Sequence, residues 1–441
     1  MTTTEINLLA DQAVLAGHAG RDQDAVRLWR QVLGAEPNHV PALTALGQRA
    51  FRAGDLPAAH AAFKLLVEIN SNDLQQWINL ALICQGLKDE AGEERAIKGA
   101  LTVDAMDLVG LILRANLLER QGKTHQAATA YGAAATVSPP MDRLAPDLRP
   151  AVLHAMAHRD LYQKNFGTFM DQYLAPHYQS FSSEKLDRFR DSIDILVGRK
   201  HRYESLSMMY HYPRLLPVEF FERVEFPWLD RIEAATSVIR DEFLQILRAD
   251  SHESDGFGAS GGASESGFTP YITYPNDVPL NQWAELNNSP SWSAFHLYKM
   301  GEIVAENAAK CPQTMALLGC APTPTQPGRT PAAMFSLLKP KTRIPPHTGV
   351  SNVRLVTHVP LIIPEGCGFR VGNTTRQWAP GKAWVFDDTI EHEAWNDSDQ
   401  LRVVLIFDIW HPQLSMAERE MIAAMSAGLN AFQGQIGGFD L

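Results

Sequence analysis

The first 140 residues of this chain repeat themselves with a period of 34 residues. The most regular column of the repeat is the series Gly20, Gly54, Lys88 and Gly122. Nine residues after each of these stands a large apolar or aromatic residue, in the series Trp29, Phe63, Ile97 and Tyr131. A period of this length, kept in phase four times, restricts this part of the chain to a stack of equivalent units that bury their apolar faces against one another.

The pattern of residue types in the repeat resembles that of tetratricopeptide repeats. The resemblance implies about four helix hairpins over residues 1–141, the first of them degenerate, with Gly or Lys at the turns. Small residues at Ala25, Ala59 and Ala127 would let the two helices of a unit approach, while Glu93 interrupts that column. Such a solenoid offers a concave groove for peptides, so the repeats are expected either to recruit a polypeptide or only to mediate self-association.

The middle of the chain, residues 142–250, is predicted to be mainly helical, with a helical connector over 142–200. In Leu229–Leu247, apolar residues recur at helical spacing, which predicts a core-facing helix. Residues 250–268 are rich in Gly, Ser and acidic residues. Such a segment buries little apolar surface, so we predict a mobile loop that is either a surface insertion or a lid over a functional site. Residues 416–441 are predicted to form a C-terminal helix or tail.

From about residue 330 onward the pattern becomes that of strands, with β-branched and apolar runs between Pro and Gly clusters. The predicted strands are Met334–Leu338, Val353–Ile363, Gly368–Val371, Ala383–Phe386 and Arg402–Ile409. Several short strands joined by turns indicate a sandwich or jelly-roll. The whole chain is therefore predicted to be an α+β multidomain protein, with a helical solenoid followed by a β domain.

Two histidines in the strand-rich segment are candidate metal ligands. His347 and His392 each stand at an apparent strand end, outside the five strands predicted above, and Arg402 follows ten residues after His392. Imidazole suits Fe(II), and the planar fork of arginine suits a carboxylate. The usual non-haem iron site adds one carboxylate ligand, but Gly349 occupies the position two residues after His347. Arg402 begins an apolar run that reads as a buried strand, where a guanidinium needs an anionic partner.

The residues around these histidines resemble the aspartyl/asparaginyl β-hydroxylase family. The resemblance is carried by His347–Leu355 and Phe386–Trp395, and it extends back to Ser336 and on to Pro412. It implies a double-stranded β-helix of the cupin-like kind over residues 201–415, with its core at 330–412. It also implies that His347 and His392 bind Fe(II), with water in place of the missing carboxylate, and that 2-oxoglutarate is the cosubstrate.

The resemblance extends to the side chains around the metal. Arg402, Ser336 and His358 match family positions that bind 2-oxoglutarate. Arg354 and Arg370 are candidate substrate-binding cations. The implied reaction is the hydroxylation of a residue in a peptide or protein, at an Asp-like or Asn-like β-carbon.

One departure from the family weakens the expectation of an acidic substrate. Family members carry a second arginine two residues after the first, and this chain has Val356 there. A small molecule or a lipid acyl chain is therefore an alternative substrate. A scaffold without catalysis and a cupin-like hydrolase or isomerase with another metal are alternative functions. Asp387 and Asp388, just before His392, are expected either to support the imidazoles or to form the turn.

Charge and composition limit the partners. The net charge of −11 argues against a nucleic-acid surface, which needs clustered positive charge. No stretch approaches the roughly 20 apolar residues of a membrane span, and the N-terminus lacks the pattern of a secretory signal. The four cysteines have no CxxC spacing and are expected to be free thiols, although Cys311 and Cys320 could pair in an oxidising compartment. The chain is expected to be cytoplasmic.

Overall fold

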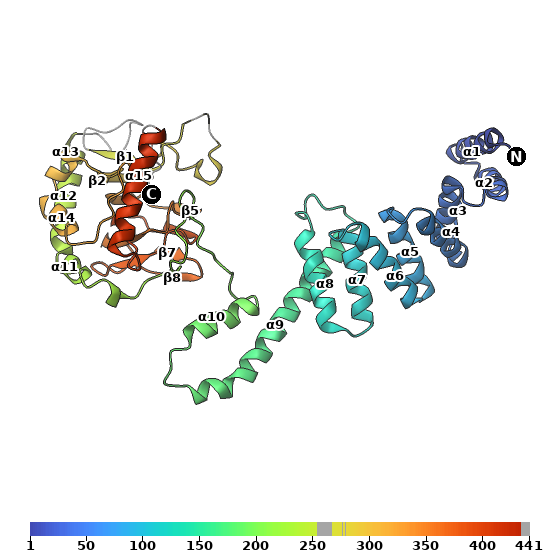
Figure 1. Cartoon of the computed structure of the whole chain (residues 1–441), viewed down its shortest axis with the longest axis horizontal. Coiled ribbons are helices and arrows are strands. Elements are labelled where there is room, and N and C mark those ends of the chain that lie inside the picture. Colours follow the sequence, from blue (N-terminus) through green and yellow to red (C-terminus); the bar gives the residue numbers. More distant parts are fainter. Residues whose placement is uncertain (254–266, 276, 278, 434–441) are drawn as a thin grey trace. The chain divides into compact units, whose positions relative to one another are not determined.

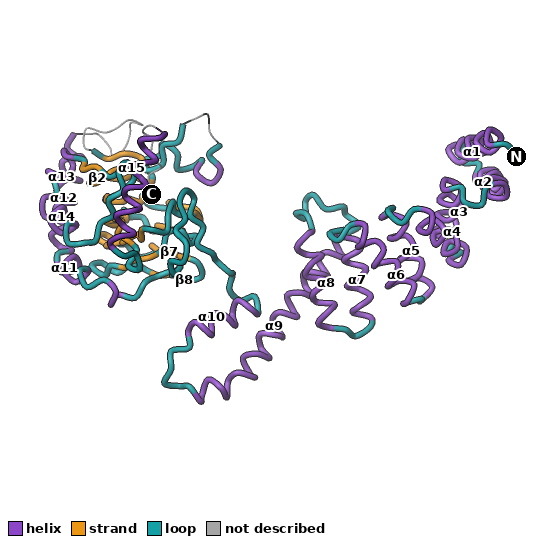
Figure 2. The backbone as a smooth tube through the Cα atoms, in the orientation of Figure 1, coloured by secondary structure: helices purple, strands orange, loops and turns teal. Residues whose placement is uncertain are grey.

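The structure is a computed structural model that describes residues 1–253, 267–275, 277 and 279–433. Its contacts divide the chain into two units, Met1–Arg199 and Lys200–Leu441. Residues 254–266 of the predicted mobile loop at 250–268 lie outside the described residues. Of the predicted tail at 416–441, helix α15 (Met416–Gln433) is described. Figure 2 shows that the first unit is helical and that the strands belong to the second.

Within the described residues, the first unit begins with four helix hairpins (Figure 1). Their helices are α1 (Thr3–His18), α2 (Asp22–Ala35), α3 (Val40–Arg52), α4 (Leu56–Ile69), α5 (Leu74–Leu87), α6 (Glu90–Val103), α7 (Leu108–Arg120) and α8 (Thr124–Val137). The two helices of each hairpin pack together, and each hairpin packs on the next. The prediction of a tetratricopeptide-like solenoid is confirmed.

The 34-residue column of glycines marks the hairpin turns. Gly20, Gly54 and Gly122 have φ angles of 70°, 78° and 68°, and Lys88 has a φ of 58°. This left-handed conformation costs glycine little because it has no Cβ. Lys88 takes up the same backbone as the C-cap of α5 and donates its backbone N–H to the carbonyls of Cys84 and Gln85. The turn geometry therefore persists where the glycine is lost.

The large residues of the repeat form the cores between helices. Trp29, Phe63, Ile97 and Tyr131 are all buried. Glu93, which interrupts the small-residue column, is also buried, and Arg120 of the next hairpin donates to both of its carboxylate oxygens at 2.6 and 2.7 Å. A buried carboxylate is tolerated when it is paired in this way.

Two further helices complete the first unit, α9 (Arg149–Ser180) and α10 (Asp187–Leu196). The first of them packs on α8. The prediction of mainly helical structure through residue 250 is wrong for 200–228, where the chain forms turns, isolated bridges and one short 3-10 helix, η1 (Arg223–Glu225). That stretch belongs to the second unit, and its backbone pairs with residues 349–351 and 389–390.

The second unit is an antiparallel sandwich of a seven-stranded and a four-stranded sheet. The larger sheet has the order β1-β2-β4-β11-β6-β9, with β3 paired to β2, and the smaller has the order β5-β10-β7-β8. The strands are β1 (Phe268–Pro270), β2 (Trp292–Lys299), β3 (Glu302–Ile303), β4 (Ala333–Leu338), β5 (Thr342–His347), β6 (Arg354–Ile362), β7 (Cys367–Val371), β8 (Thr374–Arg376), β9 (Trp384–Phe386), β10 (His392–Asn396) and β11 (Arg402–Trp410). The predicted cupin-like β domain is confirmed.

Side-chain alternation along the strands divides this unit into two cores. In β11, Val403, Leu405 and Phe407 face a core shared with helices α11 (Leu229–Ala234), α12 (Thr236–Glu253) and α14 (Pro312–Leu318). Val404 and Ile406 face the core between the two sheets. Figure 1 shows these helices together on one side of the unit, beside the short helix α13 (Ala305–Ala309).

The predicted core-facing helix at Leu229–Leu247 is two helices that meet at Ala235. Ile232, Ile239 and Phe243 are fully buried as predicted, but Val238 is 42% exposed. All four cysteines are free. No helix in the described part of the chain is both long enough and apolar enough to span a bilayer.

Candidate metal and cosubstrate site

A pocket opens between the two sheets, and the inward positions of the larger sheet supply one of its walls. Residues two apart on a strand face the same side, so β6 presents Val356 and His358 to the pocket. Strand β4 presents Ser336 by the same rule, and β11 presents Arg402 and Ile406. The opposite wall includes Ile344, His347, Phe369, His392 and Ala394 from the smaller sheet.

His347 and His392 lie directly opposite each other on the paired strands β5 and β10. Their ring centroids are 4.1 Å apart. The Nδ1 atom of His347 lies 2.7 Å from the carbonyl oxygen of Pro345, and that of His392 lies 3.0 Å from the carbonyl oxygen of Ile390. Each Nδ1 therefore carries the proton and donates it to a carbonyl, so each Nε2 keeps the lone pair that a metal needs.

Burial keeps both imidazoles neutral. Desolvation and, to a smaller extent, the neighbouring His392 lower the pKa of His347 to about 3. Desolvation likewise lowers the pKa of His392 to about 4. Because a metal binds the neutral ring, the pair is available as ligands throughout the neutral range.

The carboxylate of Asp388 occupies the space that a side chain at position 349 would need. A Cβ placed on Gly349 would lie 2.0 Å from Asp388 Oδ2. The two residues are also joined by a 2.6 Å hydrogen bond from the Gly349 N–H to the Asp388 carbonyl. Asp388 lines the pocket, and its Oδ1 has no hydrogen-bond partner among the described residues. The position two residues after His347 carries no carboxylate, because it is Gly349. The carboxylate of Asp388 nevertheless lies in the same pocket as the two histidines.

Arg354 balances the charge of this aspartate. Its Nη2 donates to Asp388 Oδ2 at 3.0 Å, and its Nε lies 4.0 Å from Asp408 Oδ2. All three side chains are buried. Burial raises the pKa of Asp388, and the Arg354 guanidinium opposes that rise. Arg354 is therefore committed to two carboxylates of the protein.

Arg402 is buried beside the pocket without a carboxylate. Its Nη1 donates to Ser336 Oγ at 3.2 Å, and its guanidinium carbon lies 4.5 Å from the centre of the Trp378 ring. Its Nε has no hydrogen-bond partner in the described part of the chain, and no carboxylate there pairs with it. Desolvation lowers its pKa to about 10, which leaves it charged at neutral pH. A buried cation of this kind calls for an anionic ligand.

His358 lies among aromatic rings on the same wall. Its ring centroid is 4.9 Å from those of Phe369 and Phe386. Its Nδ1 has no partner among the described residues, and desolvation, with repulsion from Arg402, holds its pKa well below the usual range. A neutral imidazole here can donate to or accept from a bound ligand.

Arg370 lies outside the pocket lining. It donates to Glu393 at 2.5 Å, to Glu391 at 2.9 Å and to the Tyr203 hydroxyl at 3.0 Å. Its predicted contact with a substrate, like that of Arg354, stays a prediction, and both arginines already hold carboxylates of the protein.

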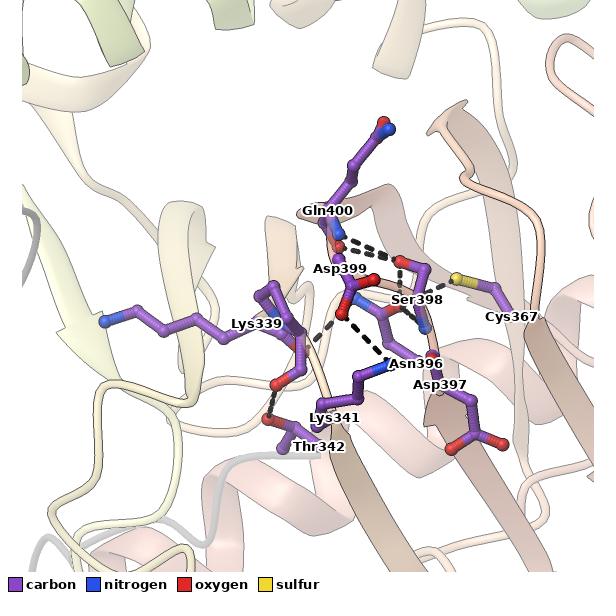
Figure 3. A network of polar contacts seen from close by, with 10 residues as sticks. Lys339, Lys341, Thr342, Cys367, Asn396, Asp397, Ser398, Asp399 and Gln400 are labelled. Carbon is purple, nitrogen blue, oxygen red and sulfur yellow. Dashed lines mark hydrogen bonds and ion pairs between the residues drawn. The ribbon is translucent and has the colours of Figure 1, made fainter.

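A buried asparagine fixes the turn between β10 and β11 (Figure 3). Asn396 donates to the carbonyls of Leu338 and Gln400 at 2.9 and 2.8 Å, and it accepts from the Ser398 hydroxyl at 2.6 Å. The contact with Leu338 ties the end of β10 to the end of β4, which belongs to the other sheet. Because His392 begins β10 and Arg402 begins β11, this turn sets the spacing between the two halves of the pocket.

The structure brings together most of the residues that the sequence singles out. His347, His392, Ser336, His358 and Arg402 all line one pocket. Sequence reasoning left Asp388 between two roles and did not find the Trp378 ring against Arg402. The bonds of Asp387 to the N–H and hydroxyl of Thr389 are those of a turn-forming aspartate. The donor set, two neutral imidazoles with a nearby carboxylate and a separate buried cation, fits a divalent metal and an anionic metal-bound ligand.

The region that contains the pocket also matches a known protein family. Residues 233–412 match the family described as aspartyl/asparaginyl beta-hydroxylase. A curated relative is the aspartyl/asparaginyl beta-hydroxylase of Mus musculus, 41% identical over 149 residues, which are 32% of this chain and 19% of that protein. This chain thus spans about a fifth of that relative.

A second relative is matched over more of its length. The ornithine lipid ester-linked acyl 2-hydroxylase of Rhizobium tropici is 32% identical over 217 residues, which are 48% of this chain and 67% of that protein. Among solved structures, a crystal structure of MamA protein is similar with a TM-score of 0.31 and 18% identity, over 39% of this chain and 94% of that one.

Proposed function

Because the chain belongs to the aspartyl/asparaginyl β-hydroxylase family, whose members are 2-oxoglutarate-dependent dioxygenases, we propose that its second unit hydroxylates an unactivated carbon of a bound substrate. The observation that carries the proposal is the pairing of two neutral, facing imidazoles with a buried guanidinium that has no carboxylate of its own within the described residues. A scaffold without catalysis would have no use for that uncompensated charge, which costs stability.

His347 and His392 would hold Fe(II) through their Nε2 atoms, since each Nδ1 is bound to a carbonyl. Arg402 and Ser336 would hold the distal carboxylate of 2-oxoglutarate. Asp388, with its free Oδ1, is placed to accept a hydrogen bond from a water in the remaining ligand position. When bound, the iron and 2-oxoglutarate supply the oxidising chemistry, in which O₂ provides the hydroxyl oxygen and the cosubstrate becomes succinate and CO₂.

The substrate group that reaches the metal is proposed to be uncharged. Arg354 is committed to Asp388 and Asp408, and Val356 gives the pocket wall an apolar side chain in place of a cation. An aspartate side chain would be buried there without a partner, which is costly. We therefore propose a peptide or protein residue of the asparagine kind, recruited by the repeats, as the first candidate substrate.

An acyl chain is the second candidate. The stretch that pairs with residues 349–351 exposes Leu206, Met208 and Met209, which are 60%, 63% and 47% exposed. An apolar surface beside an apolar pocket suits a lipid. The similarity to the Rhizobium tropici acyl hydroxylase also supports this candidate.

The first experiment measures succinate formed from 2-oxoglutarate by protein loaded with Fe(II) without oxygen and then exposed to air. We expect succinate in the wild type and none in His392→Ala. His211→Ala serves as the matched control, because His211 is exposed and lies outside the pocket lining. Equal succinate from His392→Ala, or formation that does not depend on iron, would refute the metal assignment.

A second experiment tests the charge of the substrate. Asparagine-containing and aspartate-containing peptides, together with acyl lipids, are scored by the gain of one oxygen atom in mass. The wild type is expected to prefer uncharged substrates, and Val356→Arg is expected to shift the preference toward aspartate. Preferential hydroxylation of aspartate by the wild type would contradict the proposed substrate class.

A further inference from the structure

Three potential metal ligands meet in the helical repeats, far along the sequence from the pocket. His60 lies on α4, Cys84 on α5, and Asp89 is the N-cap residue of α6. One imidazole nitrogen, the thiol sulfur and one carboxylate oxygen all lie within 4.8 Å of one another. Cys84 is buried, whereas the other two residues are partly exposed, so a metal ion can reach the cluster from solvent.

The two carboxylate oxygens of Asp89 have different neighbours. Oδ1 accepts the backbone N–H of Gly92 at 2.9 Å and so caps α6. Oδ2 turns toward the thiol. A Cβ on Gly92 would lie 2.3 Å from Asp89 Oδ2 and 2.9 Å from Cys84 Sγ, so both atoms border the same small volume beside that glycine. The helix cap therefore uses one oxygen and leaves the other beside a sulfur.

The His60 ring completes the cluster from the preceding hairpin. No hydrogen bond or ion pair holds its side chain within the part of the chain that the structure describes. In a tetrahedral zinc site, bonds of about 2.0–2.3 Å place the ligand atoms roughly 3.3–3.8 Å apart. The ligand atoms of the cluster lie within 4.8 Å of one another, so a shift of about 1 Å by the partly exposed ring would bring its nitrogen that close.

We propose that His60, Cys84 and Asp89 form a Zn²⁺ site that joins the second and third repeat hairpins. Thiolate, imidazole and carboxylate are the three side-chain types that zinc takes, and three protein ligands leave the fourth position to water. Fe(II) prefers the imidazole pair of the second unit, which contains no sulfur. The chain would thus hold two metal sites that differ in their ligands and in their role.

The test uses the full-length protein, freed of metal and titrated with Co²⁺. Only a thiolate ligand gives the near-ultraviolet sulfur-to-cobalt charge-transfer band, so the histidine pair does not contribute to this signal. We expect the band in the wild type, its displacement by Zn²⁺, and its loss in Cys84→Ser. The matched control Cys320→Ser, which changes a partly exposed thiol in the second unit, is expected to keep the band.

Two further variants separate binding from folding. Asp89→Asn keeps an oxygen that caps α6 but removes the carboxylate charge. His60→Ala removes a partly exposed side chain and should leave the helices intact by circular dichroism. Both are expected to weaken zinc binding by on the order of tenfold or more. A wild type without the band, a band that survives Cys84→Ser, or unchanged zinc affinity in folded His60→Ala would each overturn the proposal.

Discussion

At the scale of single residues, burial lowers the pKa of two groups in the pocket, and their charge states at neutral pH differ. It lowers the pKa of His347 to about 3, so the ring is neutral and can donate its lone pair. It also lowers the pKa of Arg402, but only to about 10, so the guanidinium remains charged. Desolvation therefore leaves the imidazole neutral and suited to a metal, whereas the guanidinium stays charged in spite of it and is suited to an anion.

Replacing Arg402 should weaken 2-oxoglutarate binding far more than it affects the metal. A charge-assisted hydrogen bond contributes about 1.5–3 kcal/mol, so Arg402→Ala is expected to raise the KM for 2-oxoglutarate by roughly ten- to a hundredfold. Succinate production at saturating iron measures it. Arg376→Ala is the control, because this arginine of β8 is exposed and stacks on Phe220 outside the pocket lining. An unchanged KM in Arg402→Ala would place the carboxylate site elsewhere.

Asp408 should make the stability of the second unit depend on pH. Desolvation raises its pKa from 3.8 to about 6, and the opposing attraction of Arg354 is smaller. The folded state therefore holds this proton more tightly than the unfolded chain, so stability falls as the pH rises through this window, by at most about 1.4 kcal/mol per pH unit.

The substitution Asp408→Asn removes that titration and keeps an oxygen that can accept from the Ala332 N–H. The stability of the metal-free wild type relative to the variant is expected to fall between pH 4 and pH 6 and to level off above it. Denaturant midpoints at several pH values give the difference. A relative stability that rises with pH would mean that the ion pair with Arg354 outweighs burial.

The sequence predicts the pocket residues better than it predicts their partners. His347, His392 and Arg402 could be selected because their residue types carry recognisable chemistry. The pairing of Arg354 with Asp388 could not, because it joins strand β6 to the turn before β10, 34 residues away. Which carboxylate meets which arginine depends on strand register, and a single sequence does not contain the register directly.

At the scale of elements, five strands of the second unit were predicted, whereas the other described strands, including the largely apolar and buried β2, were missed. The predicted strands at β4, β6, β7, β9 and β11 lie within two residues of their observed bounds. Strand β5 contains Pro345 and Pro346, which disfavour a strand, and three of the five residues of β10 are polar or charged. These two strands carry His347 and His392, the histidines proposed to bind the metal. The polar residues of the proposed site interrupt the apolar alternation by which a strand is recognised in a sequence.

The Asn396 network should matter for stability and for the pocket together. Asn396→Ala leaves the buried carbonyl of Leu338 without this donor, and an unsatisfied buried group costs about 1–3 kcal/mol. We expect a lower denaturation midpoint of the second unit and a higher KM for 2-oxoglutarate, because the turn sets the position of β11.

The control lies in the same network, in the exposed pair of Lys341 with Asp399, whose side chains are 62% and 89% exposed (Figure 3). Such pairs contribute little, so Lys341→Ala is expected to change stability by less than about 0.5 kcal/mol. Equal effects of the two substitutions would show that the buried asparagine does not organise the turn.

At the scale of the whole molecule, each unit has its own hydrophobic cores. The repeats bury one set of clusters, and the sandwich buries another on the two faces of its larger sheet. All residues that line the pocket belong to the second unit. The pocket therefore contains no side chain from the repeats, and chemistry and recruitment can be separated by cutting the chain at the boundary between the units.

Residues 200–441 alone are expected to fold and to convert 2-oxoglutarate to succinate at the rate of the full chain. If the repeats recruit a polypeptide, the shortened protein should lose roughly tenfold or more in kcat/KM for an asparagine-containing peptide, because local concentration is lost. Hydroxylation of an acyl lipid should not change, since a lipid reaches the pocket without the groove. Full-length and shortened protein are compared on both substrates. An unchanged kcat/KM for the peptide would leave the repeats without a recruiting role and favour the acyl chain.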